Sequence, residues 1–405
     1  MCVCTEKKKK KKKNANNVFP LAVVLLRQKG YTVEHMTKTL PEAELIEKIK
    51  GVHVLGIRSA TSLPAKVLAA ADELLMVGCF CIGTNQVDLA FATSRGIPVF
   101  NSPFSNSRSV AELIIGLIVS LSRKLGDTNS KMHQGVWLKT ADGCHEVRGK
   151  TVGIVGYGHV GSQVSVLSEG MGMKVLFYDV VPKMPLGSAT SCDSLDQLLA
   201  NADFVTLHVP ETPTTVNLIG AAQIALMRKG AYLLNYSRGT VVDLEALAAA
   251  LKSGHLAGAA VDVYPEEPKT RQAAFTSPLM GCPNTILTPH IGGSTEEAQA
   301  LIGTEVGSKI YQFLSNASSL GAVNFPEVHL ERTPNTVRIC NTHKNQPGVL
   351  TKLNSLWSSM NIASQSLRTF GPIGFVVLDL EAANAKDLKD KIRNLEESFK
   401  TRLLE

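Results

Sequence analysis

Short apolar runs alternate with amphipathic segments in the first quarter of the chain. Apolar runs bounded by Gly, Pro or Asn predict strands, and apolar positions spaced three and four apart predict helices. The predicted strands cover residues 21–26, 53–57 and 74–79, and the predicted helices cover 42–50 and 64–71. Strands that alternate with helices in this way are typical of parallel βαβ units.

A second series of the same kind follows a long apolar segment at 109–123, which predicts a helix. Apolar runs and helical patterns alternate again from 151 to 289 and predict a second open, parallel sheet. Its predicted strands lie at 150–155, 174–179, 204–209, 231–235, 258–263 and 285–288. Two such α/β domains are expected to face each other across a cleft.

The pattern changes after a proline-interrupted stretch at 324–334. It predicts a strand at 337–342, a helix at 347–360, strands at 362–370 and 375–380, a helix at 386–399 and a short final strand. This βαββαβ order is typical of a ferredoxin-like module. The predicted fold class is therefore α/β, with two Rossmann-like, doubly wound parallel-sheet domains and a C-terminal ferredoxin-like βαββαβ module.

The formal net charge of +7 arises from one cluster of seven consecutive lysines at 7–13. Removing these seven from the 42 Lys and Arg leaves a number equal to the 35 Asp and Glu, so the rest of the chain is electrically neutral. A run of like charges repels itself, which predicts a disordered lysine-rich tail at 1–17. We therefore expect no specific nucleic-acid partner and no membrane partner.

Apolar runs are short throughout; the longest after the N-terminal region, 113–121, is too short to span a bilayer. The run at 18–26 lacks the cleavage site of a secretory signal and is interpreted as the first strand. Eight cysteines in 405 residues, without CxxC spacing or nearby histidines, predict reduced thiols in a cytoplasmic protein and no metal site. Cys79 and Cys81 are expected to share a strand face and to pack as small apolar groups.

A glycine-rich motif, GYGHVG at 156–161, follows the predicted strand at 150–155 and opens a helical pattern. Gly156 permits a tight turn, Gly158 lets the backbone approach a pyrophosphate, and Gly161 lets the helix pack close to the strand. Asp179 ends the next predicted strand, where a carboxylate accepts hydrogen bonds from ribose hydroxyls and repels a 2′-phosphate. The motif therefore predicts a dinucleotide site that favours NAD over NADP.

Three ionisable residues follow predicted strands, at the edge where ligands bind to an open α/β sheet: Arg238, Glu267 and His290. Oxidation of a 2-hydroxy acid requires a guanidinium for the carboxylate, a base for the hydroxyl proton and an acid that orients the base. We expect these roles to fall to Arg238, His290 and Glu267, respectively. Each could instead be an ordinary surface residue, and their proximity in space is open at this point.

Several longer motifs resemble the D-2-hydroxyacid dehydrogenase family: GYGHVG at 156–161, SRGT at 237–240, DVYPEEP at 262–268 and PHIGGS at 289–294. CIGTNQVD at 81–88, PFSNSRSVAE at 103–112 and the terminal module narrow the resemblance to the phosphoglycerate-oxidising, ACT-domain-bearing branch. It covers nearly the whole chain. It implies a tail at 1–17, a substrate-binding domain at 18–104 completed by 291–328, an NAD-binding Rossmann domain at 105–290 and an ACT regulatory domain at 335–405.

The resemblance also implies roles for individual residues. Arg238, Glu267 and His290 would be catalytic. The cofactor residues would be Gly156, Gly158, His159, Val160, Gly161, Asp179, Tyr236, Ser237, Arg238, Asp262, His290, Ile291, Gly292 and Gly293. The substrate residues would be Arg58, Ser59, Asn106, Arg108 and Gln299, with Lys139 contributed across a subunit boundary. Tyr236 stands where the family usually has a small residue.

ACT domains pair edge to edge and bind small amino acids at their shared interface. By resemblance, His343, Asn345 and Asn361 would bind L-serine as an allosteric effector, and the chain would form a homotetramer.

The implied reaction is the reversible, NAD-dependent oxidation of 3-phosphoglycerate to 3-phosphohydroxypyruvate in serine biosynthesis, with 2-oxoglutarate reduction as a side activity. The alternatives are a sister dehydrogenase acting on glyoxylate, lactate or 2-oxoglutarate, and an NAD-sensing, corepressor-like binding protein.

Overall fold

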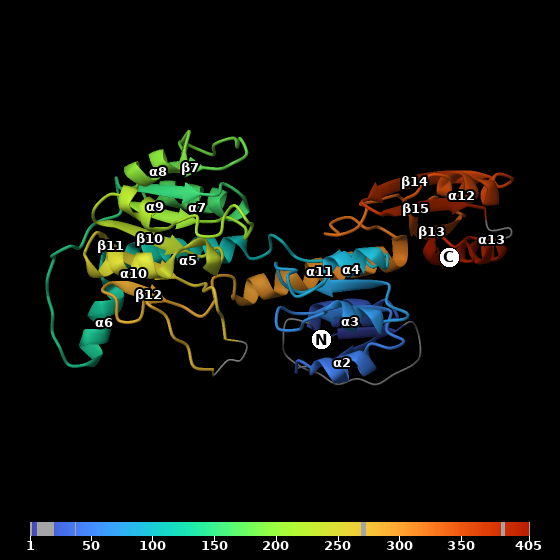
Figure 1. Ribbon diagram of the computed structural model, residues 1–405, viewed down its shortest axis with the longest axis horizontal. Coiled ribbons are helices and arrows are strands. Elements are labelled where there is room, and N and C mark those ends of the chain that lie inside the picture. Colours follow the sequence, from blue (N-terminus) through green and yellow to red (C-terminus); the bar gives the residue numbers. More distant parts are fainter. Residues whose placement is uncertain (1, 6–19, 37, 269–272, 382–384, 405) are drawn as a thin grey trace. The chain divides into compact units, whose positions relative to one another are not determined.

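The computed structural model describes residues 2–5, 20–36, 38–268, 273–381 and 385–404, which form two compact units (Figure 1). Unit 1 comprises Met1–Ser105 and Gln299–Glu405, and unit 2 comprises Asn106–Ala298. The lysine run at 7–13 lies outside the described residues. Within the described ranges, no helix has the length and apolar character needed to cross a bilayer.

Unit 1 contains a five-stranded sheet with the strand order β2-β1-β3-β4-β5. Strands β3, β4 and β5 are parallel, whereas β1 is antiparallel to both β2 and β3. The strands are β1 (Cys2–Thr5), β2 (Thr32–His35), β3 (Val54–Ile57), β4 (Met76–Cys79) and β5 (Val99–Phe100). The helices of this part are α1 (Pro20–Gln28), α2 (Glu42–Lys48), α3 (Ala65–Ala69) and α4 (Leu89–Ser94). Helix α11 (Glu296–Asn316) also belongs to unit 1 from Gln299 onward.

The strand predicted at 21–26 is wrong, because these residues belong to helix α1. Ala22, Val23 and Leu26 are buried while Val24 is 47% exposed, which is helical spacing rather than the alternation of a strand. Pro20 opens the helix, the position at which its missing N–H costs nothing. The tail predicted at 1–17 is also wrong in part, since its residues 2–5 form strand β1.

The terminal module of unit 1 confirms the predicted βαββαβ order as a four-stranded antiparallel sheet, β14-β15-β13-β16. Its elements are β13 (Val337–Lys344), α12 (Val349–Trp357), β14 (Ile362–Phe370), β15 (Ile373–Leu380), α13 (Ala385–Arg393) and β16 (Ser398–Leu404). The helix predicted at 386–399 was too long, because α13 ends at Arg393 and residues 398 and 399 already belong to β16. One sheet face packs against α12 and α13 through Ile339, Leu353 and Leu388.

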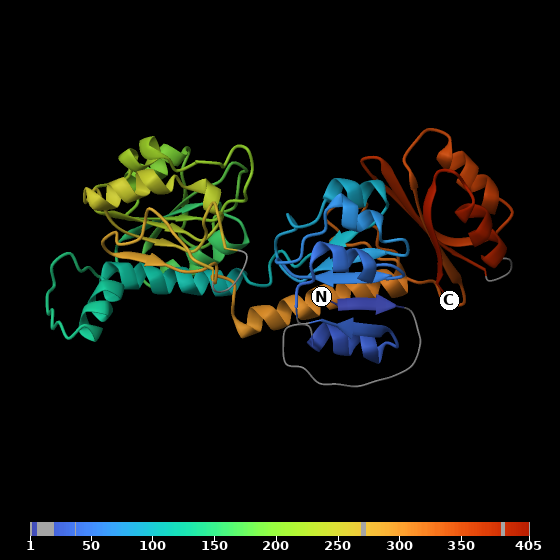
Figure 2. The same cartoon turned by 60° about the horizontal axis from the view of Figure 1, so that its bottom comes forward.

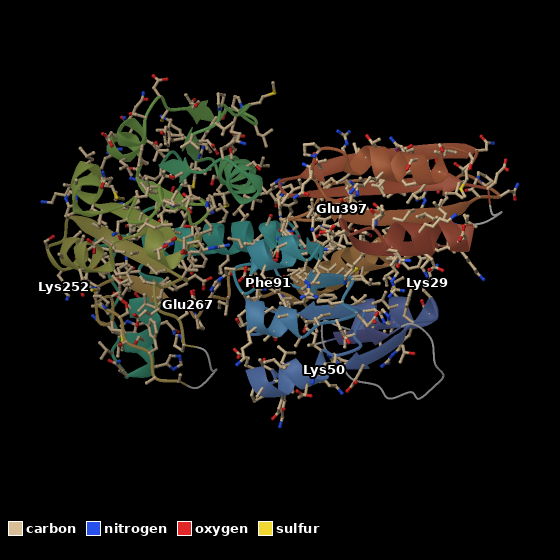
Figure 3. All side chains as sticks on the ribbon, turned by 45° about the vertical axis from the view of Figure 1, so that its right-hand side comes forward. Lys29, Lys50, Phe91, Lys252, Glu267 and Glu397 are labelled. Atoms are coloured by element: carbon tan, nitrogen blue, oxygen red, sulfur yellow. The ribbon has the colours of Figure 1, made fainter. Side chains whose placement is uncertain are left out.

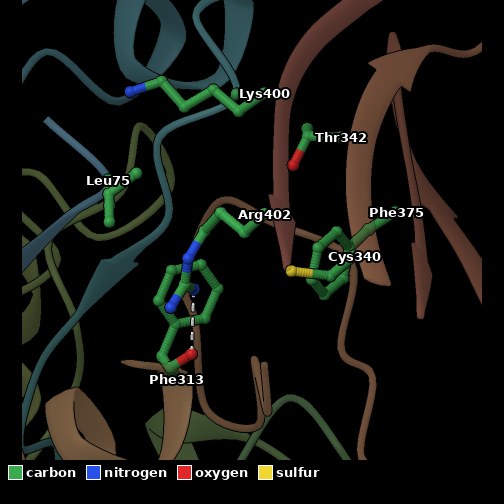
Figure 4. A pocket seen from close by; sticks show the side chains of 8 residues that line it. Leu75, Phe313, Cys340, Thr342, Phe375, Lys400 and Arg402 are labelled. Atoms are coloured by element: carbon green, nitrogen blue, oxygen red, sulfur yellow. Dashed lines mark hydrogen bonds between the residues drawn. The ribbon is translucent and has the colours of Figure 1, made fainter. Parts of the chain in front are cut away.

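The other face of the module packs on the end of helix α11 and on the N-terminal sheet of unit 1. Arg402 on β16 donates hydrogen bonds to the carbonyl oxygens of Phe313 (3.1 Å) and Leu314 (2.6 Å), and its guanidinium lies over the Phe313 ring (Figure 4). Lys400 donates to the carbonyl oxygen of Leu74. These cations therefore satisfy carbonyl groups that the helix end and the loop before β4 leave unpaired.

Arg338 on β13 is fully buried and pairs with the equally buried Asp379 of β15. Two guanidinium nitrogens donate to the carboxylate at 2.6 and 2.7 Å. The remaining hydrogen bonds go to the carbonyl oxygens of Asn316, Leu330 and Glu331 at 2.7 to 2.8 Å. A buried charge is tolerated when its donors are satisfied in this way.

Unit 2 is built on a seven-stranded sheet with the order β12-β11-β10-β9-β6-β7-β8, in which every pair is parallel. The strands are β6 (Thr151–Val155), β7 (Lys174–Tyr178), β8 (Thr190–Ser191), β9 (Phe204–Leu207), β10 (Ala231–Asn235), β11 (Leu256–Val261) and β12 (Thr285–Leu287). The helices are α5 (Ser107–Ser122), α6 (Leu125–His133), α7 (His159–Gly170), α8 (Leu195–Asn201), α9 (Ala221–Leu226) and α10 (Leu244–Lys252). The six strands predicted for this region are confirmed.

Helices cover both faces of this sheet, as the colours of Figure 2 show for the teal α5 on one side and the yellow α10 on the other. Because side chains alternate along a strand, Ile154 packs with α5 and α7, whereas Val155 packs with α8, α9 and α10. The strand order reverses between β6 and β9. In an open α/β sheet, such a reversal at the carboxyl ends of the strands is where a ligand binds.

Candidate functional site

The glycine-rich turn after β6 has the form that a bound pyrophosphate requires. Gly156 has φ +91°, and a Cβ on it would lie 2.6 Å from the carbonyl oxygen of His208. A Cβ on Gly161 would overlap the carbonyl oxygen of Gly156, so only glycine lets α7 approach the turn this closely. A Cβ on Gly158 would meet nothing within 4 Å, so the N-terminus of α7 is open to an anion.

Asp179 follows β7 and is fixed against the same turn. Its Oδ2 accepts a hydrogen bond from the Tyr157 backbone N–H (2.8 Å), and its Oδ1 accepts one from Val181 N–H (3.0 Å). Each oxygen retains a lone pair for a ribose hydroxyl. The donor and acceptor set of this turn therefore fits NAD.

His290 and Glu267, the base and supporting acid that the motifs predicted, are in contact. His290 Nδ1 lies 3.0 Å from Glu267 Oε1 and 2.8 Å from Oε2, and the two side chains are exposed, at 54% for His290 and 37% for Glu267. Glu267 lies in the segment that follows β11, labelled in Figure 3. The pair joins two loops that are separated by 23 residues in the sequence.

The electrostatics of the pair match a base and its supporting carboxylate. The hydrogen bond to Glu267 raises the pKa of His290 above its ordinary value, against the effects of burial and of the nearby Arg238 charge. Burial alone would raise the pKa of Glu267, but the hydrogen bond from His290 and the charges of His290 and Arg238 lower it overall. Arg238 is therefore close enough to act on both partners.

The Arg238 loop is held by local contacts. Asn235, the last residue of β10, accepts hydrogen bonds from Ser237 N–H and Oγ and donates one to the carbonyl oxygen of Arg238. A Cβ on Gly239 would overlap the backbone of Tyr264, so this loop contacts the segment that leads to Glu267. The guanidinium itself donates one bond, to the carbonyl oxygen of Ser237 (2.7 Å).

Asp262 organises the loop that carries His290. Its Oδ1 accepts hydrogen bonds from Thr288 Oγ1 (2.5 Å) and Ile291 N–H (2.9 Å), and its Oδ2 accepts one from Gly292 N–H (2.7 Å). Its carbonyl oxygen accepts the N–H of His290 (2.8 Å). His290 has φ +54°, a strained conformation for a residue other than glycine, and these bonds hold it there.

Tyr236, which the resemblance places beside the cofactor, extends the network. Its hydroxyl lies 3.0 Å from Thr288 Oγ1. Because Thr288 must donate to the Asp262 carboxylate, Tyr236 is the donor in this bond. Burial raises the pKa of Tyr236 and keeps this donor protonated. Tyr236 and Thr288 therefore act on the His290 loop through Asp262.

Two residues of this network, Thr288 and Asn235, were missed in the sequence. The sequence signal that could have indicated them is their position beside the motifs, since Thr288 precedes Pro289-His290 and Asn235 precedes the Arg238 loop. Two other histidines of unit 2 are engaged locally: His208 Nε2 bonds to Thr206 Oγ1 (3.0 Å) and His255 Nε2 to the Ile224 carbonyl oxygen (2.9 Å).

The substrate residues expected from the resemblance divide between the units. In unit 1, Arg58 donates to Gln299 Oε1 (2.8 Å) across 241 positions of sequence, and Ser59 follows Arg58 at the end of β3. In unit 2, Asn106 lies against Gly293, and its buried Oδ1 has no hydrogen-bond partner among the described atoms.

The remaining two expected substrate residues lie on the surface of unit 2. Arg108 is exposed and paired with Glu112 (2.6 Å), and Lys139 lies in an exposed segment after α6. Among the described residues, no cluster of His, Cys, Asp and Glu could hold a metal ion.

Comparison with known proteins agrees with this geometry. Residues 115–292 match the family model described as D-isomer specific 2-hydroxyacid dehydrogenase, NAD binding domain. A D-3-phosphoglycerate dehydrogenase of Dictyostelium discoideum is 55% identical over 96% of this chain and 95% of its own length. One from Escherichia coli K12 is 51% identical over 94% of this chain and 93% of its own length.

The fold also matches solved structures. The crystal structure of D-lactate dehydrogenase from Aquifex aeolicus, complexed with NAD and lactic acid, has a TM-score of 0.62 and 28% identity. The match covers 71% of this chain and 90% of that one. The chain therefore belongs to the NAD-dependent D-isomer specific 2-hydroxyacid dehydrogenases, and within them to the group whose curated members are named D-3-phosphoglycerate dehydrogenase.

Proposed function

We propose that this chain oxidises 3-phospho-D-glycerate at C2 to 3-phosphohydroxypyruvate with NAD, reversibly, as the first step of phosphorylated L-serine biosynthesis. The observation that carries the proposal is the His290–Glu267 pair with the Arg238 charge beside it. The names of curated relatives at 55% and 51% identity support the same substrate.

His290 is the proton acceptor in this reaction. A carboxylate can only accept hydrogen bonds, so the neutral imidazole carries its proton on Nδ1, toward Glu267, and keeps a lone pair on Nε2. Nε2 takes the proton of the C2 hydroxyl while the C2–H electron pair leaves with its hydrogen as hydride. NAD, when bound, supplies the acceptor for that hydride. Glu267 stabilises the imidazolium that results.

Arg238 binds the substrate carboxylate. One guanidinium nitrogen is held by the carbonyl oxygen of Ser237, and this contact fixes the plane of the group. The remaining N–H groups can form a two-pronged pair with a carboxylate. The positive charge also lowers the pKa of His290, which counteracts part of the Glu267 effect and keeps the base neutral at a lower pH.

A phosphate-bearing substrate requires further cations and donors. Arg58 is oriented by Gln299, and a guanidinium is well suited to a dianion because it donates through several parallel N–H groups. Asn106, with its unpartnered Oδ1, is suited to a substrate hydroxyl. We assign Ser59 and Arg108 to the same group by resemblance, and Lys139 as a contribution from a second subunit.

The arrangement of the terminal module supports the proposed effector site, which the resemblance implies. Asn345 contacts the 371–372 turn through the carbonyl oxygens of Gly371 and Pro372, whereas Asn361 donates to Glu381. These contacts lie at opposite ends of β14, a strand of nine residues, so they are about 30 Å apart. One small amino acid cannot touch both within one module.

Among the described strands, β14 pairs only with β15, so it is an edge strand of the sheet. Antiparallel pairing of β14 with β14 of a second copy would bring Asn361 of that copy to the Asn345 end of the first. We therefore propose that L-serine binds where two modules meet, within a homotetramer. His343 is buried beneath this end and hydrogen-bonded to Asn341, so we assign it to shaping the site.

The test is NADH formation from 3-phosphoglycerate with a trap for phosphohydroxypyruvate. His290→Asn is expected to lower kcat at least about 100-fold, the usual contribution of a general base. His255→Asn is the matched control, because that ring bonds only to a carbonyl oxygen in the described contacts of unit 2. Absence of NADH formation by a folded, NAD-binding wild-type sample would overturn the proposal.

Arg58→Ala separates the phosphoglycerate enzyme from a sister dehydrogenase. Its activity toward 3-phosphoglycerate should fall while any reduction of glyoxylate or 2-oxoglutarate is unchanged. Equal losses on phosphate-bearing and phosphate-free substrates would contradict the phosphate role of Arg58. Addition of L-serine to the wild type and to Asn361→Ala tests the effector site in the same assay.

A further inference from the structure

Two cysteines lie at the carboxyl end of β4, close to Arg58 of unit 1. Cys79 is the last residue of the strand and is fully buried. The chain bends at Phe80, whose N–H bonds to the Ile57 carbonyl oxygen (2.7 Å), and Cys81 follows with its side chain partly exposed. The neighbouring Cys79 thiol has the largest effect on the pKa of the Cys81 thiol.

Arg58 reaches the same edge from the neighbouring strand. β3 and β4 are parallel, with Ile57 opposite Cys79, so Arg58 and Cys81 both leave the sheet at its carboxyl edge. The guanidinium is oriented by Gln299. Its positive charge acts on the Cys81 sulfur.

The surroundings of Cys81 stabilise a thiolate. Its Sγ accepts a hydrogen bond from Gln86 Nε2 (3.2 Å), while the thiol form donates to the Gly83 carbonyl oxygen (3.2 Å). The hydrogen bond from Cys79 lowers the pKa of Cys81, with further contributions from Gln86 and Arg58 and against the effect of burial. The same hydrogen bond, together with burial, raises the pKa of Cys79, which therefore remains the donor.

Cys144 provides a comparison within the same chain. It and Cys81 are the partly exposed members of the six cysteines whose side chains are described, and the other four are buried. The Sγ of Cys144 has one long contact, to the carbonyl oxygen of Arg123 at 3.7 Å, and the neighbouring Lys124 ammonium donates its described hydrogen bond to the carbonyl oxygen of Asp142. The two sites thus differ in the groups that favour ionisation.

We propose that Cys81 is a modification site of unit 1, where a hydroperoxide oxidises the thiolate to a sulfenic acid. The sulfur attacks the distal peroxide oxygen, the S–O bond forms as the O–O bond breaks, and the leaving alkoxide or hydroxide takes up a proton. Sulfur loses two electrons and the peroxide gains them. A thiol reductant reverses the reaction through a mixed disulfide, with loss of water.

The consequence for substrate binding rests on the proposed function. The sulfenic acid places a new oxygen acceptor at the edge that Arg58 shares with Cys81, where it competes with a substrate phosphate for the guanidinium. Loss of one charge-assisted interaction at Arg58 is expected to raise KM for 3-phosphoglycerate about tenfold. The His290–Glu267 pair lies in unit 2, so kcat at saturating substrate should change much less.

Site-resolved mass spectrometry tests the chemistry without reference to catalysis. The full chain is exposed to hydrogen peroxide with a sulfenic-acid-trapping dione, and adducts are quantified at each cysteine over time. The Cys81 adduct should form roughly tenfold or more faster than the Cys144 adduct, since the thiolate is the reactive form. Cys79→Ala removes the S–H donor and should slow the reaction at Cys81. Equal rates at Cys81 and Cys144 would overturn the assignment.

Kinetics test the link to Arg58. Peroxide should raise KM for 3-phosphoglycerate in the wild type and in Cys144→Ser, and dithiothreitol should restore it. Cys81→Ser keeps a hydrogen-bonding atom beside Gln86 and should resist peroxide. A Cys81→Ser enzyme as sensitive as the wild type would refute the proposal. Failure of untreated enzyme to oxidise 3-phosphoglycerate would instead remove the proposed function, and the adduct rates would still decide the reactivity of Cys81.

Discussion

Asp262→Asn should impair the enzyme by disturbing the His290 loop rather than by removing a reacting group. The carboxylate is 2% exposed and accepts three hydrogen bonds, from Thr288, Ile291 and Gly292. An amide has one acceptor oxygen. If that oxygen occupies the Oδ1 position, the new NH₂ group faces the Gly292 N–H, and two donors meet.

The expected fall in kcat of Asp262→Asn follows from these contacts. One charge-assisted bond worth about 1.5–3 kcal/mol is lost, and the other two become neutral and weaker. The loop also holds His290 at φ +54°, a strain of about 1–3 kcal/mol that the Asp262 bonds offset. A total near 3 kcal/mol in the placement of His290 corresponds to a fall in kcat of roughly 100-fold.

The assay is kcat for NADH formation from 3-phosphoglycerate, with NAD affinity and melting temperature measured on the same samples. Asp243→Asn is the matched control, because Asp243 Oδ1 accepts two backbone N–H groups at the start of α10, where Asn caps equally well. Its kcat should stay within about twofold, as Asn and Asp are similar N-caps. A kcat for Asp262→Asn within about threefold of wild type would refute this account of the loop, because the bonds lost are each worth more than that factor.

Three further outcomes are expected. Glu267→Gln removes the largest cause of the raised His290 pKa, so the acid limb of the kcat/KM profile for oxidation should move to lower pH. If the acid limb does not move, Glu267 does not control the pKa of the base. Gly161→Ala should weaken NAD binding in titration calorimetry because its Cβ overlaps the turn, whereas Gly170→Ala in the same helix has open space and should not. Arg338→Leu leaves a buried carboxylate unpaired and should lower the free energy of unfolding by about 3–5 kcal/mol in urea titrations, whereas a loss below about 1 kcal/mol would mean that the pair is not buried in solution.

The stability of the His290–Glu267 pair should itself depend on pH. The folded pKa of His290 is raised, so its contribution is complete below the unfolded value and is lost as pH rises through the folded value. The folded pKa of Glu267 is lowered, so its contribution is present above the unfolded value and is lost as pH falls through the folded value. The pair therefore stabilises unit 2 between these two limits.

The nucleotide turn and the residues of the His290–Glu267 pair could be predicted from the sequence because their signals are local. Gly156, Gly161 and Asp179 stand at fixed offsets from a strand, and His290 and Glu267 each lie in a short motif that follows a predicted strand, although their proximity could not be read from it. The roles of Tyr236 and Thr288 could not be predicted, because their hydrogen bond joins residues 52 positions apart. Such a pairing depends on which strands become neighbours in the sheet.

The error at α1 has a different origin. A short apolar run is compatible with a strand or a buried helix, and only the pattern of burial separates the two. Val24 points to solvent while Ala22, Val23 and Leu26 pack with residues of α11 that lie nearly 300 positions later. The contacts that decide between helix and strand here therefore join residues that are far apart in the sequence.

The hydrogen bonds of Arg338 bear on how the C-terminal module could be gained or lost in evolution. Three acceptors of its guanidinium, the carbonyl oxygens of Asn316, Leu330 and Glu331, precede the first strand of the module. A gene fragment that starts at residue 335 would retain Asp379 but would lack these three acceptors. The corresponding N–H groups of Arg338 would then be buried in an apolar interior without hydrogen-bond partners. A module that is transferred between genes must therefore include the end of α11. In chimeras of paralogues, junctions before residue 316 should be tolerated better than junctions between α11 and β13.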